Sequence, residues 1–437
     1  MAVTTEKGPQ GTQPPAQSKA PFRAFKNRDF TLFWAASLMS ITTFFMLMIT
    51  RGQYMLDLTN SAFMVSAIQA VPGLPMLVLS MFGGVIADRF NRKKVLLTAE
   101  VVNLAANLAL AVLVITDTIQ VWQIFALAVV NGVAFSTSMP SRMASVPNML
   151  PRQDIASGVA MMTTVFSGAS MVGPALAGVL MSNTSMGIAF LVPSLLMLPA
   201  TVCLLLSNVK HQPNAGTHNI SMFRSIWEGV RWIKAQPIMM ALMLIGFAMT
   251  VFGMPFQAMM PVISKDLLTE PGLGAALFGL PGGLASGLNP KLGLGVLGAI
   301  IGLGSVAGSI AVATFGESAN RSRVLMVGSL GFALTLIAFA LSPNFLLSCV
   351  LALVVGFLLQ MFMTSNVTLV QMLSPDNIRG RVLSIRMIIF GLGPLGQLLI
   401  GYGAETMGTA LATALMAVVC LVLTLVVFAT YPSIRKL

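Results

Sequence analysis

Four ionisable residues lie within or at the ends of long apolar stretches. Glu100 follows Lys94 by six residues, which places it roughly 9 Å along a helix. A carboxylate at that depth needs a partner or a proton. Arg142 has a compatible depth on the next stretch, so we expect a structural Glu100–Arg142 ion pair. The alternative is that Glu100 carries a proton during the function of the protein. Arg51 and Asp57, six residues apart on the first stretch, offer a second pair or a set of solvated rim charges.

A charged turn after the second apolar stretch follows the pattern G-x-x-x-D-R-x-x-R-K. Its carboxylate, Asp88, can bind the free N–H groups and the positive dipole at the start of another helix. We expect Asp88 to form such a latch with the start of the stretch near 378–381. Glu317 takes the equivalent position in the second half, and we expect it to bind the start of the fifth stretch, near Arg152 and Asp154. Orienting the chain in a membrane is the other explanation for the positive residues. The expected latch set is Gly84, Asp88, Arg89, Arg92, Lys93, Glu317, Arg321, Arg323, Arg379 and Arg381.

The elements that must position these residues are membrane-spanning helices. Of the 437 residues, 56% are hydrophobic and 9% are charged, whereas soluble domains carry roughly 25% charged residues. Apolar runs of roughly 20 residues recur along the chain, and each can cross a bilayer as a helix. The sequence therefore predicts an all-α polytopic membrane protein whose main partner is the lipid bilayer.

Twelve spans are predicted, in two sets of six. The spans lie near 30–56, 62–87, 94–116, 121–146, 154–181, 186–207, 237–264, 291–314, 323–342, 345–372, 378–403 and 408–430. The polar connection between the sets has apolar residues at helical spacing from Ile220 to Ile233, which predicts an amphipathic helix in the membrane interface. The resulting domains are a disordered tail at 1–28, a six-helix bundle at 29–207, a linker at 208–236, a second bundle at 237–430 and a tail at 431–437.

Basic residues are distributed unevenly between the two ends of the predicted spans. All but three of the 25 lysines and arginines fall on the side that carries both termini, and the exceptions are Arg51, Lys265 and Lys291. Because positive loops stay in the cytoplasm, both termini are predicted to be cytoplasmic, in the inner (plasma) membrane. This distribution accounts for the net charge of +12, so no nucleic-acid partner is expected.

No metal or cofactor site is predicted. Both histidines, His211 and His218, lie in one polar loop, and the three cysteines lie inside apolar runs. Two histidines do not supply the ligands of a zinc site. The pattern G-x-G-x-x-G at 391–396 has no strand before it, so it predicts a bend in a helix and no dinucleotide site. The sequence also lacks H-E-x-x-H and G-x-S-x-G, which argues against an intramembrane enzyme.

The two halves repeat one another, and their motifs resemble the major facilitator superfamily of solute transporters. Residues 91–96 are echoed at 320–325. The charged turn resembles the superfamily's loop between helices 2 and 3, and Gly173, Pro174 and Gly178 resemble its antiporter motif. The resemblance implies twelve transmembrane helices in two six-helix pseudo-repeats, working by alternating access.

The segments that begin at Asp57 and Pro140 resemble the branch holding enterobactin-type exporters and macrolide efflux pumps. This resemblance implies export of a hydrophobic or siderophore-like small molecule by a monomer, with proton antiport as one means of coupling. Helix 4 carries Asn131 where many drug–proton antiporters place an arginine, which leaves the coupling ion open. A solute uptake symporter and a non-transporting membrane sensor are the alternatives.

The resemblance also places the first, fourth, seventh and tenth helices around a central substrate cavity. Methionine and phenylalanine accompany polar residues on these helices, and flexible, polarisable side chains suit varied apolar ligands. Ordinary helix packing is the other explanation for the same residues. The residues expected to line the cavity are Thr43, Asn131, Phe135, Gln257, Gln360 and Asn366.

Overall fold

The helices of the protein match the predicted spans closely. The computed structural model describes residues 23–75, 77, 79, 91–209, 222–269, 288–315 and 321–436. Eleven helices in this part of the chain are long and apolar enough to cross a membrane, and Ala62–Pro75 is a further, shorter apolar helix. The rest of the predicted second span lies largely outside the described residues. The prediction of a polytopic helical membrane protein is confirmed.

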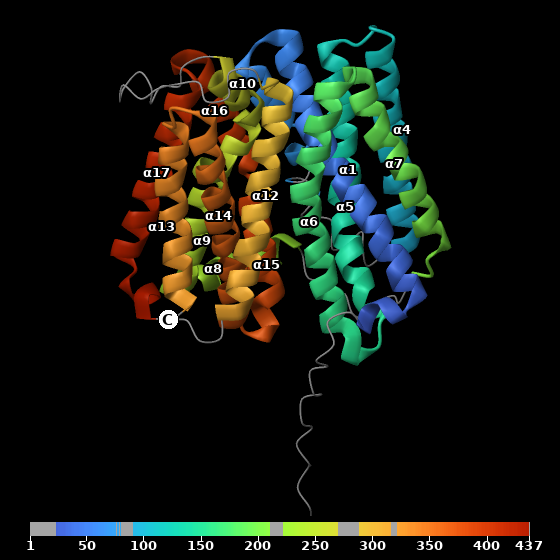
Figure 1. Ribbon diagram of the computed structural model, residues 1–437. Coiled ribbons are helices and arrows are strands. Elements are labelled where there is room, and N and C mark those ends of the chain that lie inside the picture. Colours follow the sequence, from blue (N-terminus) through green and yellow to red (C-terminus); the bar gives the residue numbers. More distant parts are fainter. Residues whose placement is uncertain are drawn as a thin grey trace, which may run out of the picture.

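The first half of the chain, blue to green in Figure 1, is built from capped helices. They are α1 (Arg28–Thr59), α2 (Ala62–Ala70), α4 (Arg92–Ile115), α5 (Val121–Met149), α6 (Ile155–Asn183) and α7 (Met186–Leu206). The side chains of Asn27, Ser61 and Asn91 accept hydrogen bonds from the backbone N–H groups that follow them, so these polar residues begin α1, α2 and α4. Asn60 ends α1 with a φ of 47°, the left-handed conformation that closes many helices.

The second half, yellow to red in Figure 1, begins with the linker helix. Its helices are α8 (Met222–Ala235), α9 (Pro237–Ala248), α10 (Met260–Thr269), α12 (Pro290–Phe315), α13 (Arg321–Ala340), α14 (Phe345–Leu373), α15 (Asp376–Gly391), α16 (Gly393–Met407) and α17 (Thr409–Thr430). The linker helix α8 packs against α15, where Arg381 Nη1 donates to Glu228 Oε2 at 2.6 Å. Trp227 on the same helix is 68% exposed. This combination is what an amphipathic helix in a membrane interface would show, and its place in the interface stays a prediction.

Two spans of the second half are interrupted at prolines. The seventh span passes from α9 through a π-turn (Met249–Gly253) and a 3-10 turn (Met254–Met259) into α10. Pro255 lies at the start of the 3-10 turn, and proline cannot donate the backbone hydrogen bond that a continuous helix needs. The eleventh span breaks at Leu392, between α15 and α16, two residues before Pro394 in the first turn of α16. The helix is thus interrupted where the sequence predicts a bend.

The two halves meet along α6 and α12, which lie side by side at the centre of Figure 1. Near the predicted outer end their backbones touch, because a Cβ atom added to Gly178 would lie only 2.5 Å from Cα of Gly295. Small residues allow such close approach of helices in a membrane. α2 packs against α16 at the same end, with Gly401 against Ser66. The halves are therefore closed against one another at the predicted outer end.

Candidate functional site

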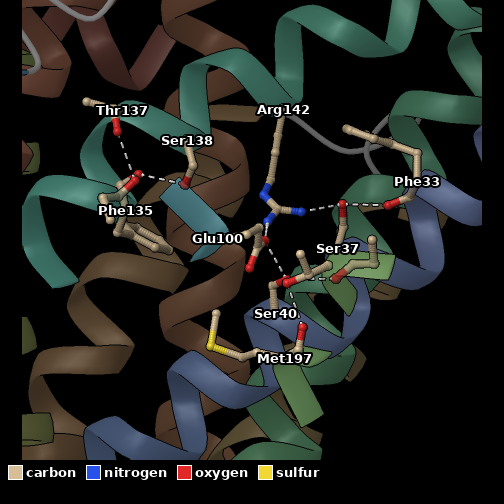
Figure 2. Close-up of polar contacts among 12 residues, drawn as sticks. Phe33, Ser37, Ser40, Glu100, Phe135, Thr137, Ser138, Arg142 and Met197 are labelled. Carbon is tan, nitrogen blue, oxygen red and sulfur yellow. Dashed lines mark hydrogen bonds and ion pairs between the residues drawn. The ribbon is translucent and has the colours of Figure 1, made fainter. Parts of the chain in front are cut away.

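The predicted partners Glu100 and Arg142 form a buried ion pair inside the first half. Glu100 on α4 is 2% exposed and Arg142 on α5 is 3% exposed, and Arg142 Nη2 contacts Glu100 Oε1. Figure 2 shows the two side chains facing one another, with Ser37 and Ser40 beside them. Ser40 Oγ donates to Glu100 Oε1 at 2.6 Å, and Arg142 Nη1 donates to Ser37 Oγ at 2.7 Å. Helix α1 thus holds both members of the pair through two serines.

A cavity of about 50 Å³ lies next to this pair, between α1, α4, α5 and α7. Such a volume has room for a few water molecules or a small polar group. Glu100 and Arg142 both line it, together with three of the expected cavity residues, Thr43, Asn131 and Phe135. Glu100 Oε2 is buried and has no hydrogen-bond partner among the described residues. One carboxylate oxygen of the buried pair therefore has no partner in the described part of the chain.

Arg51 lines the same cavity and does not pair with Asp57, which is one of the two alternatives expected for these residues. Arg51 is 7% exposed, and its Nη2 donates to Asn107 Oδ1 at 2.8 Å. Asp57 instead pairs with Lys291 Nζ at 2.8 Å, across the two halves. Residues six apart on a helix point in directions that differ by roughly 120°, and only those three or four apart face one another. Arg51 consequently turns into the first half while Asp57 turns toward the second.

The other three expected cavity residues, Gln257, Gln360 and Asn366, do not line this cavity, so a single substrate cavity shared by all six stays a prediction. Gln257 lines a separate cavity of about 180 Å³ between the halves, where Gln69 and Thr250 also lie. Gln360 Nε2 donates to Thr364 Oγ1 at 3.3 Å on its own helix, α14. Asn366 is buried and bonded to neighbouring helices.

The contacts of Asn366 fix it within the second half. Its Nδ2 donates to the carbonyl of Leu242 at 3.0 Å, and its Oδ1 accepts from Arg386 Nε at 3.0 Å. The Arg386 guanidinium also lies 4.6 Å from the centre of the Phe390 ring, a distance that suits a cation–π contact. Protein partners thus occupy both ends of the Asn366 amide, so packing explains this residue better than ligand binding.

A polar network that sequence reasoning missed joins the halves at the predicted outer end. Glu405 Oε2, near the end of α16, accepts from Ser61 Oγ at 3.0 Å and from the backbone N–H of Phe63 at 3.1 Å. Lys265 Nζ donates to Asn60 Oδ1 at 2.6 Å. Together with the Asp57–Lys291 pair, these contacts form what we call the outer network. Its signal in the sequence is the pair of lysines that depart from the general charge distribution, Lys265 and Lys291.

Glu405 reproduces, at the opposite end, the geometry expected of the predicted latch. It is an acid near the end of one helix that binds the N-terminus of a helix in the other half, where N–H groups and the helix dipole favour negative charge. Of the latch residues themselves, Gly84, Asp88, Arg89 and Glu317 lie outside the described residues. The contact between Asp88 and the eleventh span therefore stays a prediction.

The remaining latch residues have contacts within their own halves. Lys93 Nζ donates to the carbonyls of Leu205 and Ser207 at 2.8 and 2.7 Å, at the end of α7. A cation suits that position, because the last carbonyls of a helix lack partners. Arg92 donates to the carbonyl of Ala144, Arg379 to those of Gln371 and Ser374, Arg381 to Glu228, and Arg321 to the sulfur of Met372. Arg323 lies in the first turn of α13.

The residues of the antiporter-like motif lie where α6 closely approaches neighbouring helices. A Cβ atom added to Gly173 would lie 2.7 Å from Cβ of Phe45 on α1. Pro174 packs against Gly298 of α12, and Gly178 against Gly295 of the same helix. The motif thus joins α6 to its own half through Gly173 and to the other half through Pro174 and Gly178.

Comparisons with known proteins agree with this architecture. The family model described as transmembrane secretion effector matches residues 18–436. Macrolide efflux protein A of Streptococcus pyogenes is 22% identical over 388 residues, covering 87% of this chain and 90% of that protein. The enterobactin exporter EntS of Citrobacter koseri is 24% identical over 358 residues, covering 81% of this chain and 79% of that protein.

Solved structures of transporters share the fold. A nucleoside transporter, NupG, matches with a TM-score of 0.74 at 13% identity, covering 92% of this chain and 100% of that chain. A bacterial homologue of the human lysosomal transporter Spinster, in an inward-facing, unoccupied conformation, matches with a TM-score of 0.69 at 12% identity, covering 96% and 99%. The family model matches nearly the whole chain, and the twelve helices are arranged in two repeats. The protein is therefore a membrane transporter of the major facilitator superfamily and belongs to its transmembrane secretion effector family.

Proposed function

We propose that this transporter exports hydrophobic or siderophore-like small molecules from the cytoplasm by alternating access, in exchange for protons. The two relatives named above are a macrolide efflux protein and an enterobactin exporter, which supports export over uptake. The observation that carries the proposal is the buried Glu100–Arg142 pair beside a cavity. A titratable group in that position can link a proton to a change of shape.

Glu100 has the contacts that a proton carrier needs. Its Oε1 is held by Arg142 and Ser40, while Oε2 has no hydrogen-bond partner among the described residues. A proton on Oε2 would remove the negative charge and weaken the attraction to Arg142, which matters more in a buried site than in water. Proton binding in one conformation and release in the other would then drive exchange, because each conformation has a different affinity for the proton.

The outer network supports alternating access. It holds the halves together at one end through contacts that are individually weak, such as the partly exposed Asp57–Lys291 pair. Contacts of this strength can be exchanged for others when the transporter opens outward. We place both termini in the cytoplasm, because the basic residues gather at that end. In the outward-open state the Asp88 latch would close the cytoplasmic end instead.

Inside-out membrane vesicles test this function. With an acidic interior, they should accumulate a labelled macrolide or enterobactin through this protein, since an exporter moves substrate from the cytoplasmic face into the vesicle. Glu100→Gln should abolish accumulation driven by the pH gradient yet retain downhill exchange of the same substrate. Asp117→Asn, which removes an exposed carboxylate from the turn after α4, is the matched control and should retain both activities.

Two outcomes would contradict the proposal. Release of substrate from loaded vesicles together with protons would show an uptake symporter. A Glu100→Gln variant that accumulates substrate across the pH range as well as the parent protein would remove Glu100 from coupling.

A further inference from the structure

The cavity of about 180 Å³ between the halves lies where two membrane spans are interrupted. Thr250 belongs to the π-turn of the seventh span, and Met254 and Pro255 belong to the 3-10 turn that follows it. Gly393 and Pro394, directly after the break in the eleventh span, also line the cavity. Irregular backbone at membrane depth is tolerated where it is buried or lines a cavity, and interrupted helices commonly form ligand sites. The two interruptions therefore point to a ligand at this place.

Thr250 supplies this cavity with a buried hydroxyl that has no partner. The residue is 3% exposed, and its Oγ1 has no hydrogen-bond partner in the part of the chain that the structure describes. Other buried threonines, such as Thr50 and Thr424, donate to the carbonyl four residues before them. An unpaired buried hydroxyl lowers the stability of a protein. A ligand that bonds to Thr250 would remove that destabilisation.

Three glutamines line the same cavity and add further hydrogen-bonding groups. Gln69 Nε2 already donates to the carbonyl of Met48 at 3.0 Å. The side-chain amides of Gln257 and Gln397 make no hydrogen bond to any described residue. Each amide can donate and accept, so the two amides and the Thr250 hydroxyl suit groups that also do both, as hydroxyl groups do.

The walls and the volume of the cavity limit what can bind there. Met254, Pro255, Phe390 and Pro394 supply apolar contacts. A cavity of about 150 Å³ holds a benzene ring, so this one has room for a single substituted ring. None of the described lining residues is ionisable, although Arg386 lies against Phe390, so a charged group would lose its hydration without a counter-charge in the lining. The cavity therefore fits an uncharged ring that carries hydroxyl groups.

We propose that this cavity binds an uncharged, hydroxyl-bearing ring of the substrate, with the Thr250 hydroxyl and the Gln257 and Gln397 amides as its hydrogen-bonding partners. The assignment rests on the export function proposed above and names the substrate group that is recognised. The cavity shares no described lining residue with the one beside Glu100 and Arg142. Ligand and proton would therefore bind at separate places.

Thermal unfolding of the purified full-length protein tests the assignment with three probes of similar shape. Resorcinol, an uncharged ring with two hydroxyl groups, should raise the unfolding midpoint in a saturable way. Two related probes should bind roughly tenfold more weakly or not at all. These are meta-dimethoxybenzene, which cannot donate hydrogen bonds, and meta-hydroxybenzoate, which is charged at neutral pH.

Thr250→Val removes the unpaired hydroxyl and nearly keeps the shape of the side chain. It should weaken the apparent affinity for resorcinol roughly threefold to tenfold, the range expected for one neutral hydrogen bond, while Thr250→Ser should retain most of the affinity. Without ligand, the unfolding midpoint of Thr250→Val should be no lower than that of the parent protein, because the variant removes an unsatisfied buried group. A purely structural role of Thr250 would lower that midpoint instead.

Thr424→Val is the matched control for this variant. Thr424 is fully buried as well, but its hydroxyl donates to the carbonyl of Cys420, and it does not line the cavity. The affinity of Thr424→Val for resorcinol should equal that of the parent protein.

Alkylation of an engineered cysteine locates the bound ring. In a background with the three native cysteines replaced, Met254→Cys places a thiol in the lining of the cavity, and resorcinol should slow its reaction with N-ethylmaleimide. Met139→Cys is the control, because Met139 is also half-buried but lines the cavity beside Glu100 and Arg142. Its alkylation rate should not respond to resorcinol.

Three kinds of result would overturn the assignment. Equal affinity for resorcinol and meta-dimethoxybenzene would show that hydrogen bonding is not recognised, and equal affinity for meta-hydroxybenzoate would show that a charge is accepted. An unchanged resorcinol affinity in Thr250→Val, or protection of Met139→Cys in place of Met254→Cys, would place the site elsewhere.

Vesicle accumulation of the macrolide separates this inference from the export function. Accumulation without any response to resorcinol rejects the assignment of this cavity alone, whereas absence of accumulation for every substrate rejects export.

Discussion

Glu405 joins the two halves at the predicted outer end of the transporter, so we expect its charge to bias the equilibrium between open and closed states of that end. Glu405→Gln removes the negative charge that binds the start of α2 and leaves the side-chain shape nearly unchanged. Since its partners are Ser61 Oγ and the N–H of Phe63, the charge lies at the positive end of a helix dipole. At an exposed site this interaction contributes about 0.3–1 kcal/mol. The ratio of outer-open to outer-closed protein should therefore rise by roughly twofold to fivefold.

Thiol accessibility measures that ratio. Ser66 is fully buried where α2 meets α16, and its Oγ donates to the carbonyl of Gln397. In a background with the three native cysteines replaced, Ser66→Cys should react with a membrane-impermeant reagent only when the outer end opens. Glu405→Gln should raise the labelling rate by the same twofold to fivefold. High salt should raise the rate of the parent protein toward that of the variant, because salt screens exposed charges.

Asp117→Asn is the control for this experiment. Asp117 is exposed in the turn after α4, with a φ of 52° that asparagine also tolerates. The substitution removes one carboxylate without touching the outer network. If Glu405→Gln labels no faster than the parent and Asp117→Asn, the outer network does not bias the equilibrium, and our reasoning about it is refuted.

Two further predictions concern the buried Glu100–Arg142 pair and the seam between the halves, where Gly178 of α6 meets Gly295 of α12. Arg142→Gln should lower the free energy of unfolding by about 3–5 kcal/mol, because it leaves Glu100 as an unpaired buried charge. The double variant Glu100→Gln/Arg142→Gln should lose less unfolding free energy, because no buried charge is left unpaired. Equal losses for the two variants in denaturant unfolding would contradict the pairing. Gly178→Ala should raise the Ser66→Cys labelling rate at least fivefold, since overpacking costs about 1–3 kcal/mol. Gly168→Ala on the same helix is the control, because nothing lies within 4 Å of the added Cβ, and matching rates for the two alanine variants would contradict the close contact.

The depth of a residue in the membrane can be predicted from its position along a helix. The side of the helix that it faces can also be predicted, if the helical period is applied. Glu100 and Arg142 can be paired from their positions alone, since a bilayer fixes how far each residue lies from the end of its span. The same reasoning fails for Arg51 and Asp57, because depth ignores the 100° rotation per residue that turns them apart. The period of an α-helix separates these two residues and needs only their positions in the chain.

Contacts between the halves are the part that the sequence cannot supply. Glu405 has no local pattern that distinguishes it from a solvated acid, and its partners, Ser61 and Phe63, are more than 340 residues away in the chain. Such a contact exists only because α2 and α16 pack together. The interruption of the seventh span is different, because Pro255 is visible in the sequence and already argues against a continuous helix there.

The seam between α6 and α12 also sets the scale of motion in this transporter. Where Gly178 meets Gly295, there are no long side chains to disengage, so this point suits a pivot. The close approach continues to Met171, which packs against Gly302, and α6 extends a further 16 residues to Ile155, about 24 Å. A rotation of about 10° about the seam would move that end of the helix by roughly 4 Å. A small rotation at the seam would therefore be enough to open a path for a small molecule at the opposite end.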